Sequence, residues 1–379
     1  MKIVIAPDSF KESLSAYETA CAIERGFRSI LPDAEYMKIP MADGGEGTVQ
    51  SLVDATGGTI VKQVVTGPLG KPVDAFFGML GDGQTAVIEM AAASGLHLVP
   101  PEKRNPLFTT SRGTGELMLA ALDKGAKHLI IGLGGSATND GGVGMMQGLG
   151  AFFLDKAGQD LTPGGGSLNQ LASIDLSRLD PRLQSVRLEV ACDVDNPLTG
   201  ERGASAVFGP QKGADAEMVQ LLDKNLSHFA QVAKQQLHVS FGDAAGAGAA
   251  GGLGASLLGF LQADLQKGID IVLKAVHFAD VLKDADLVIT GEGRIDQQTI
   301  YGKTPIGVAK AAKQYGLPVI GIAGSLSKDS AVVHDHGIDA LFSIVPGVTT
   351  LAEAMYDASV YVERTARNIA AVMTFGRDK

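Results

Sequence analysis

The sequence predicts an α/β protein built from two domains. Apolar, β-branched runs alternate with helical patterns at both ends of the chain, which is typical of a parallel sheet covered by helices. In the middle of the chain, short strands follow one another with no room for helices between them, which is typical of antiparallel hairpins. A chain of 379 residues is long enough for two or three domains of ordinary size.

The N-terminal part reads as strand, helix, strand, helix. Ile3–Ala6 and Tyr36–Ile39 are short apolar runs that predict strands. Between them, apolar side chains recur every three or four residues and make one helical face, namely Ala16, Ala20, Ile23, Phe27 and Ile30. Either Ser13 or Ser15 can cap this helix. Glu46–Ala55 is expected to be the second helix.

Three apolar runs near the C-terminus predict buried strands that alternate with helices. They are Asp286–Thr290, Pro318–Ala323 and Ala340–Val345. A last helical stretch repeats small or apolar residues from Leu351 to Val372. This regular seam predicts that the last helix packs on the sheet.

The middle of the chain has a different pattern. Ile60–Val65, Val73–Gly78 and Thr85–Met90 predict antiparallel strands, whereas Lys127–Gly132 reads as a parallel strand preceded by a helix at Gly115–Lys124. We therefore predict a Rossmann-like parallel-sheet domain that comprises residues 1–58, 106–150 and 280–379. A mixed α/β domain, residues 59–105 and 151–279, is expected to be inserted into it discontinuously.

The composition excludes several classes of protein. The formal net charge is −10 and no basic stretch is present, so we expect neither nucleic-acid nor anionic-membrane binding. The glycine-rich stretch Ala244–Ala263 is too rich in small residues to predict a membrane span, and the N-terminus lacks the pattern of a signal peptide. Cys21 and Cys192 read as free thiols. These features predict a soluble, cytoplasmic protein.

The 49 glycines are concentrated in loops that follow predicted strands. Three such loops are Asp43–Gly47, Gly132–Gly142 and Gly291–Asp296. Ligands of open parallel sheets bind beyond the carboxyl ends of the strands, where glycine lets the backbone approach phosphate oxygens. Three glycine loops on one edge therefore predict a polyphosphate site. The alternative is that some glycines serve tight turns or close packing only.

Two standard phosphate motifs are incomplete. Gly132-x-Gly134-x-x-Ala137 fits the relaxed dinucleotide fingerprint, but the acidic residue expected further along is only loosely matched by Asp155. Gly302-Lys303-Thr304 resembles the end of a P-loop, but Gln297 occupies the first glycine position, so we reject that motif. The stretch 246–259 stays unassigned between packing and ligand binding.

Acidic residues interleave with the glycine loops. They are Asp8, Asp43, Glu46, Asp140, Glu292 and Asp296. Carboxylates would repel a phosphate unless a cation lies between them, and Mg²⁺ does this in kinases. Lys11, Arg112 and Arg294 lie near the same edge and could neutralise a phosphoryl group or a substrate carboxylate. The pattern favours phosphoryl transfer.

Several stretches together resemble the type I glycerate kinases from end to end, and look close to the enterobacterial members. They are 6–11, 42–47, 110–117, 134–142, 191–198, 207–214, 248–252 and 289–296. Glu12 is a departure, because many members have glycine there. The resemblance implies two α/β domains with an active-site cleft between them, and ATP-dependent phosphorylation of (R)-glycerate, also called D-glycerate. The implied product is 2-phosphoglycerate, made in glyoxylate or aldarate catabolism and passed to glycolysis; 3-phosphoglycerate is the alternative product.

Because kinases rely mainly on positioning and charge stabilisation, we form a hypothesis about the roles of residues in this chain. ATP phosphates are expected on two loops, at Gly134, Gly135, Ser136, Asn139, Asp140, Gly291 and Gly293. Glu292 and Asp296 are the candidate Mg²⁺ ligands. The remaining candidates are Lys11 and Arg294 for the moving phosphoryl group, Asp43 or Asp193 as the catalytic base, and Asp8, Ser9, Ser111 and Arg112 for glycerate. 

Two other functions stay open at this point. A nicotinamide-dependent hydroxy-acid dehydrogenase would share the fold and the substrate class. A non-catalytic sensor of phosphorylated acids would keep the glycine loops. The sequence leaves open whether the chain forms a homo-oligomer.

Overall fold

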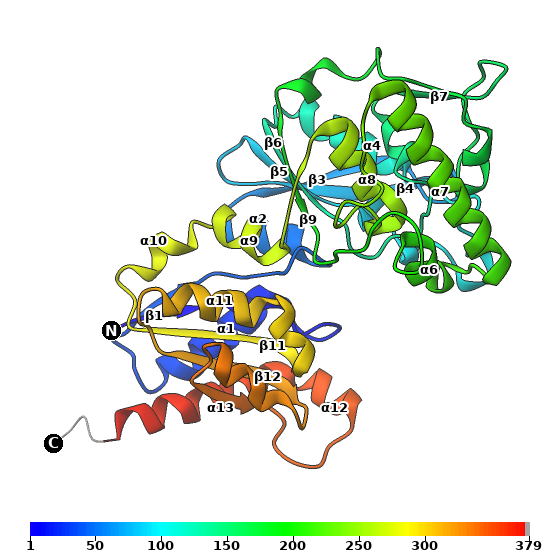
Figure 1. Ribbon diagram of the computed structural model, residues 1–379. Coiled ribbons are helices and arrows are strands. Elements are labelled where there is room, and N and C mark those ends of the chain that lie inside the picture. The colour runs from blue at the N-terminus through cyan, green and yellow to red at the C-terminus, as the bar shows by residue number, and fades with distance from the viewer. Residues whose placement is uncertain (376–379) are drawn as a thin grey trace. The chain divides into compact units, whose positions relative to one another are not determined.

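The computed structural model describes residues 1–375, and they divide into two compact units. Unit 1 contains residues 1–43 and 50–57 together with the chain from 269 onward, and unit 2 contains residues 44–49 and 58–268. Figure 1 shows each unit with its own sheet. The mixed α/β prediction is confirmed.

Unit 1 is organised around a parallel five-stranded sheet. The strand order is β13 (Ala340–Ser343), β12 (Val319–Leu326), β11 (Leu287–Ile295), β1 (Lys2–Ile5) and β2 (Glu35–Lys38). The helices are α1 (Ala16–Arg28), most of α2 (Thr48–Thr56), α9 (Gly268–Ala275), α10 (Phe278–Leu282), α11 (Thr304–Lys313), α12 (Leu351–Tyr356) and α13 (Ala358–Thr374), with 3₁₀ helices η6 (Gln297–Tyr301) and η7 (Ser330–His336).

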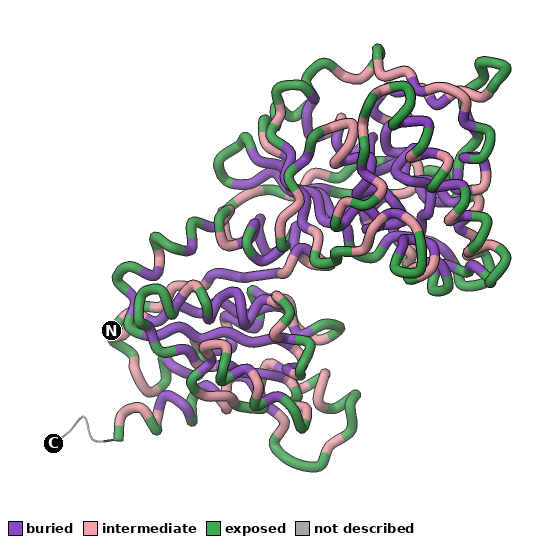
Figure 2. Tube along the Cα trace, in the orientation of Figure 1, coloured by how far each residue is buried: buried purple, intermediate pink, exposed green. Residues whose placement is uncertain are grey.

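The central strands of the unit 1 sheet are buried on both faces. Ile3 and Ile5 share a core with α1 and α13, and Val4, which points to the opposite face, is also fully buried. Figure 2 shows these central strands as buried segments. Ser15 caps α1 in a capping box with Glu18. The predicted C-terminal seam is buried at Ala358, Val362 and Ile369 but exposed at Leu351 and Val372. Leu351 belongs to a separate helix, α12, and Val372 lies in the last turn of α13.

Unit 2 is organised around a mixed six-stranded sheet. Its order is β10 (Asp264–Gln266), β9 (Arg187–Ala191), β6 (His128–Gly132), β5 (Thr85–Glu89), β4 (Pro72–Met79) and β3 (Thr59–Thr66). Strands β10, β9, β6 and β5 run parallel, and β5, β4 and β3 form the predicted antiparallel hairpins. A two-stranded ribbon of β7 (Phe152–Leu154) and β8 (Ser173–Asp175) is separate.

The helices of unit 2 surround this sheet. They are α3 (Ala91–Ser94), α4 (Arg112–Asp123), α5 (Val143–Gly148), α6 (Ala204–Phe208), α7 (Ala216–Leu237) and α8 (Ala249–Leu261), with 3₁₀ helices η1 (Leu96–Leu98), η2 (Pro101–Lys103), η3 (Gly165–Gln170), η4 (Pro181–Gln184) and η5 (Pro210–Lys212). Among residues 1–375, none of the helices has both the length and the apolar character that crossing a bilayer requires.

The division of the chain differs from the predicted one in one large segment and in the short segment 44–49, which was expected with the N-terminal end of the chain but lies in unit 2. Residues 106–150 were expected with the two chain ends, but they lie in unit 2, because β6 pairs with β5 and β9. A buried parallel strand can enter any parallel sheet, and the apolar pattern of Lys127–Gly132 does not specify the partner. The later boundary also moves, from 279/280 to 268/269.

The stretch that the sequence left unassigned is explained by packing. Ala250, Gly251 and Gly252 adopt left-handed backbone angles in a row before the regular part of α8. The Gly251 carbonyl accepts a hydrogen bond from Gly141 N (3.0 Å), and Ser256 Oγ donates to Gly141 O (2.6 Å). A Cβ at position 251 would lie 1.9 Å from Thr138 O. The segment therefore supports the glycine loop that follows β6.

Gly251→Ala is expected to destabilise unit 2 more than Gly200→Ala. Both glycines have positive φ, but a Cβ at Gly200 would meet nothing within 4 Å. The difference in the free energy of unfolding between the two variants therefore measures the steric contact alone, and we expect it to be about 1–3 kcal/mol. Urea unfolding of both variants tests this; equal destabilisation would show that Thr138 moves away without cost.

Candidate functional site

The loop after β6 is the centre of the site in unit 2. Gly134 and Gly135 are exposed, whereas the residues from Ser136 to Asp140 are buried. Neighbouring elements fix the loop through its backbone: Leu96 N donates to Gly135 O (2.8 Å), and Thr109 Oγ1 donates to Ala137 O (2.8 Å). The accessible part of the loop is therefore Gly134 and Gly135, and Ser136 begins its buried part.

Asp140 organises the loop from inside. Its carboxylate accepts hydrogen bonds from Ser111 N and Oγ (both 2.8 Å), from Gly142 N (3.1 Å) and from Gly144 N (3.3 Å). Burial raises the pKa of Asp140, and these hydrogen bonds oppose the rise. Asp140 and Ser111 therefore have partners within the chain, and neither side chain faces solvent.

Two other predicted residues of unit 2 differ in their surroundings. Asn139 is fully buried, and its Nδ2 donates to Ser205 Oγ (2.9 Å). Arg112 is half-exposed, and its Nε lies 3.0 Å from Glu116 Oε1 on the next turn of α4. Of these two side chains, only Arg112 is open to solvent.

The glycine loop at residues 44–47 packs on the loop that follows β6. A Cβ at Gly132 would lie 2.4 Å from Gly44 O, and a Cβ at Gly134 would lie 3.5 Å from Gly45 Cα. Asp193 follows the end of β9 and is exposed, with its Oδ1 accepting from Gly268 N (3.1 Å). The carboxyl ends of β6 and β9 thus bring Gly134–Ser136, the 44–47 loop and Asp193 to one edge of the unit 2 sheet.

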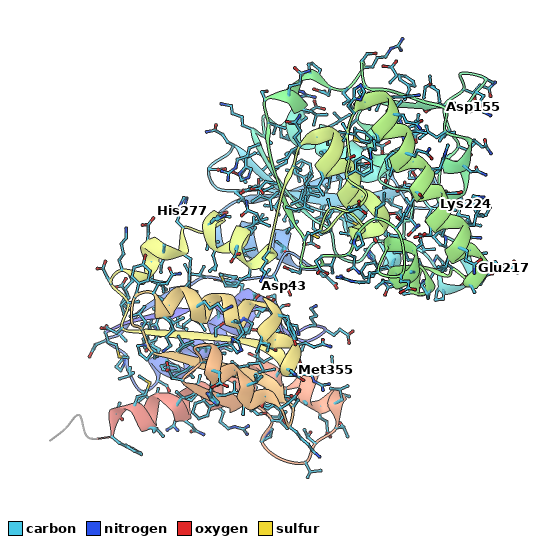
Figure 3. The ribbon with its side chains drawn as sticks, in the orientation of Figure 1. Asp43, Asp155, Glu217, Lys224, His277 and Met355 are labelled. Carbon is cyan, nitrogen blue, oxygen red and sulfur yellow. The ribbon has the colours of Figure 1, made fainter. Side chains whose placement is uncertain are left out.

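Unit 1 carries a separate set of predicted residues at the carboxyl ends of β1 and β11. Asp8 N donates to Gly291 O (2.8 Å), and the Asp8 carboxylate accepts from Thr304 Oγ1 (2.6 Å) and Ser9 N (2.6 Å). Burial raises the pKa of Asp8 to about 6, and the charge of Asp43 adds to the rise. Figure 3 labels Asp43, which lies in the segment after β2.

Glu292 is the second buried carboxyl group of this set. Its Oε1 accepts from Thr299 Oγ1 (2.6 Å), and its Oε2 lies 3.5 Å from Lys303 Nζ. Burial raises the pKa of Glu292 to about 7, and the negative charge of Asp8 contributes in the same direction. Two neighbouring carboxyl groups with raised pKa values are typical of a functional site.

The other candidates of unit 1 lie around this pair. Asp296 caps η6 by accepting from Gln298 N (2.9 Å), and its Oδ2 lies 3.4 Å from Arg294 Nε. Arg294 and Lys11 are exposed. Gly293 approaches the backbone of Phe10 and Lys11, whereas a Cβ at Gly291 would lie 1.9 Å from Ile322 O. Close packing of β11 on β12 therefore explains Gly291 without a ligand.

Sequence reasoning missed three residues of these sites. Lys303 and Thr304 belong to the stretch rejected as a P-loop, yet they contact Glu292 and Asp8. Lys212 is fully buried and donates to Ser136 Oγ (2.8 Å) and Thr138 O (2.7 Å). A lysine in the apolar, glycine-containing stretch 207–214 was the available signal.

A buried carboxylate with a raised pKa makes stability depend on pH. The pKa of Glu292 is about 7 in the folded protein against 4.5 in the unfolded chain, so the folded state binds the proton more tightly. The stability that this tighter proton binding gives to the folded protein is fully present below pH 4.5, and it is lost as the pH rises through about 7.

Glu292→Gln is therefore expected to raise the melting temperature at pH 8 and to leave it unchanged near pH 4.5. The gain at pH 8 corresponds to at most about 3 kcal/mol, because each pKa unit is worth about 1.4 kcal/mol. Glu353→Gln is the control of opposite sign, since hydrogen bonds from Thr350 lower the pKa of that exposed carboxyl group. A lower melting temperature for Glu292→Gln at pH 8 would show that Lys303 fully compensates the charge.

Comparison with known proteins identifies the family. A model of the "Glycerate kinase family" matches residues 3–374. The chain is 71% identical to "Glycerate kinase" of Bacillus subtilis, covering 98% of this chain and 97% of that protein. It is 60% identical to "Glycerate 2-kinase" of Escherichia coli, covering 99% of each.

A solved structure agrees with these relatives. A crystal structure from Salmonella typhimurium LT2, provisionally assigned as glycerate kinase 2, covers 100% of both chains with 59% identity and a TM-score of 0.93. Glu12 has a φ of 62°, a conformation that favours glycine, so the glycine that the resemblance led us to expect at this position has a physical reason. The resemblance read from the motifs is confirmed: the chain belongs to the glycerate kinase family, and it is a kinase.

Proposed function

We propose that the protein transfers the γ-phosphoryl group of ATP to the 2-hydroxyl of (R)-glycerate and releases 2-phosphoglycerate and ADP. The observation that carries the proposal is a pair of neighbouring buried carboxyl groups in a kinase of this family: Asp8 follows β1, and Glu292 lies in the carboxyl-terminal half of β11. The name of the Escherichia coli relative, glycerate 2-kinase, supports the 2-hydroxyl. The proposal includes a cytoplasmic location and a role in glyoxylate or aldarate catabolism.

Mg²⁺ fits the donor set of unit 1. Proteins bind Mg²⁺ through one or two carboxylates together with substrate phosphates and water. The neighbouring carboxyl groups of Glu292 and Asp8 are donors of this kind. When bound, Mg²⁺ would neutralise charge on the phosphates. Glu292 is the proposed ligand; Asp296 is less available, because it caps η6 and lies near Arg294.

The turn Gly134–Ser136, whose two glycines are exposed, is proposed to bind the phosphates of ATP. Leu96 fixes Gly135 through a backbone hydrogen bond, and Ser94 and Thr109 fix Ala137, the residue that follows the turn. Asn139 and Asp140 are buried, so we assign them to holding the loop rather than to direct contact with phosphate. Gly293 keeps its proposed phosphate role, whereas Gly291 is explained by packing.

The solvent exposure of each candidate side chain decides which substrate role we propose for it. Lys11 and Arg294 are exposed cations, as a contact with the moving phosphoryl group requires. Arg112 is favoured over Ser111 for the glycerate carboxylate, because Ser111 is buried against Asp140. Asp43 and Asp193 stay the two candidates for the base that accepts the proton of the glycerate hydroxyl, while Asp8 and Ser9 are proposed to line the substrate site.

One experiment tests the reaction. The protein is incubated with ATP, Mg²⁺ and each enantiomer of glycerate, and the products are identified by ³¹P NMR. We expect 2-phosphoglycerate and ADP from (R)-glycerate only. Formation of 3-phosphoglycerate would overturn the choice of hydroxyl. Oxidation of glycerate with a nicotinamide, seen at 340 nm without ATP, would instead indicate a dehydrogenase, and binding without ADP formation would indicate a sensor.

A further inference from the structure

Lys212 is a charged side chain that the proposed reaction does not yet use. It ends the short helix η5, which Pro210 begins, and only 1% of its surface is exposed. Its Nζ donates to Ser136 Oγ (2.8 Å) and to Thr138 O (2.7 Å). Both acceptors belong to the loop after β6.

Burial of this ammonium group is costly, because both of its acceptors are uncharged oxygens. The negative charge of Asp140 attracts Lys212 without a direct hydrogen bond. The Asp140 carboxylate instead accepts hydrogen bonds from Ser111, Gly142 and Gly144. A buried charge without a direct partner is retained in proteins when it has a function or gains a partner on binding.

The loop above Lys212 is open to an anion. Gly134 and Gly135 are exposed and directly precede Ser136, whose hydroxyl oxygen accepts the hydrogen bond from Lys212 Nζ. The same loop also has unused hydrogen-bonding capacity: Thr138 Oγ1 and Asn139 Oδ1 are buried without a hydrogen-bond partner. An anion on the Gly134–Ser136 turn would therefore lie near a cation that has no direct negative partner.

We propose that Lys212 is the buried cation of a phosphate-binding turn formed by Gly134, Gly135 and Ser136. It orients the Ser136 hydroxyl and supplies the positive charge that pairs with a bound polyphosphate. Lys212 is thus a positioning residue for the ATP phosphates. This inference rests on the proposed function, in which that turn binds ATP.

The proposal links phosphate binding to the proton on Lys212. Burial lowers the pKa of Lys212 to about 7, while the charge of Asp140 acts to raise it. At pH 8 the side chain is therefore largely neutral in the free protein. A bound polyphosphate favours the ammonium form, so binding draws a proton from solution, and by reciprocity the proton strengthens binding.

The test is calorimetric titration of the full-length protein with ATP and Mg²⁺ at pH 8, in two buffers with different ionisation enthalpies. We expect wild-type protein to take up close to one proton per ATP bound. Lys212→Met, which keeps the volume and removes the charge, should take up none and should raise the KM for ATP by about 10–10², with a smaller change in kcat. Lys224→Met is the control, because Lys224 is exposed on α7 (Figure 3) and should behave as wild type.

Each outcome decides the proposal. Absence of proton uptake by the wild-type protein at pH 8 overturns it, and this measurement needs no variant, so a folding defect of Lys212→Met does not leave it untested. A folded Lys212→Met protein with wild-type KM for ATP also overturns it. Failure of the wild-type protein to phosphorylate glycerate would overturn the proposed function instead, and the proton uptake on ATP binding is measured independently of that reaction.

Discussion

Asp140→Ala should lower the free energy of unfolding of unit 2 by about 3–5 kcal/mol. The variant leaves four buried donors without their acceptor, on Ser111, Gly142 and Gly144, and removes the charge that acts on Lys212. The loop that presents Gly134–Ser136 would lose its internal anchor, so the KM for ATP should rise as well. Urea unfolding and steady-state kinetics measure the two effects.

Asp155→Ala is the matched control for this variant. Asp155 also accepts hydrogen bonds from two backbone N–H groups, those of Ala157 (2.8 Å) and Gln159 (2.9 Å), but it is partly open to water and lies in a turn of the ribbon that contains β7 (Figure 3). Since water can replace the lost acceptor, we expect a loss of about 1 kcal/mol or less. A similar loss for both variants would mean that Asp140 does not organise the loop.

One of the variants Asp43→Asn and Asp193→Asn should lower kcat by about 10² or more, which is the size expected for loss of a general base. The amide keeps the shape of the side chain but cannot accept the proton of the glycerate hydroxyl. The KM values for glycerate and ATP should change much less than kcat, because binding contacts are retained. Steady-state kinetics at saturating ATP separate the two candidates.

Each of these variants has a neighbouring control. Asp195→Asn removes a nearby exposed carboxylate that is paired with Arg202 (2.9 Å), and Glu46→Gln removes an exposed acid close to Asp43 in the sequence. Asp195→Asn should keep kcat within a few-fold of wild type, whereas Glu46→Gln, which lies in the 44–47 loop, shows how much a second acid beside Asp43 contributes. If neither Asp43→Asn nor Asp193→Asn reaches the expected loss, the base assignment is wrong.

Much of the fold could be predicted from local patterns. The hairpins near Ile60–Met90 and the parallel strands at both chain ends follow from period, turn residues and β-branched runs, and they are confirmed. The partner of the strand Lys127–Gly132 could not be predicted, because a strand buried on both faces has the same apolar pattern in either sheet.

The site was less accessible to sequence reasoning. The loop after β6 follows its strand as predicted, but the loop expected at Gly291–Asp296 is wrong, because β11 continues to Ile295 through its pairing with β12. The glycine pattern also did not show which members face solvent: Gly134 is exposed, whereas Asp140 is buried. Lys212 and Thr304 were missed because their contacts, with Ser136 and Asp8, join residues far apart in the chain. Composition and spacing do not encode such distant pairs.

The division of the chain has a consequence for synthesis on the ribosome. Unit 2 is complete in sequence at Gly268, whereas β11, the strand that lies between β1 and β12 in unit 1, begins only at Leu287. The N-terminal strands β1 and β2 are therefore synthesised first, but their sheet can form fully only after most of the chain has been synthesised. Unit 2 can fold as the nascent chain emerges, while the N-terminal segment stays without its central partner. Chaperone binding during translation is accordingly expected to concentrate on residues 1–43.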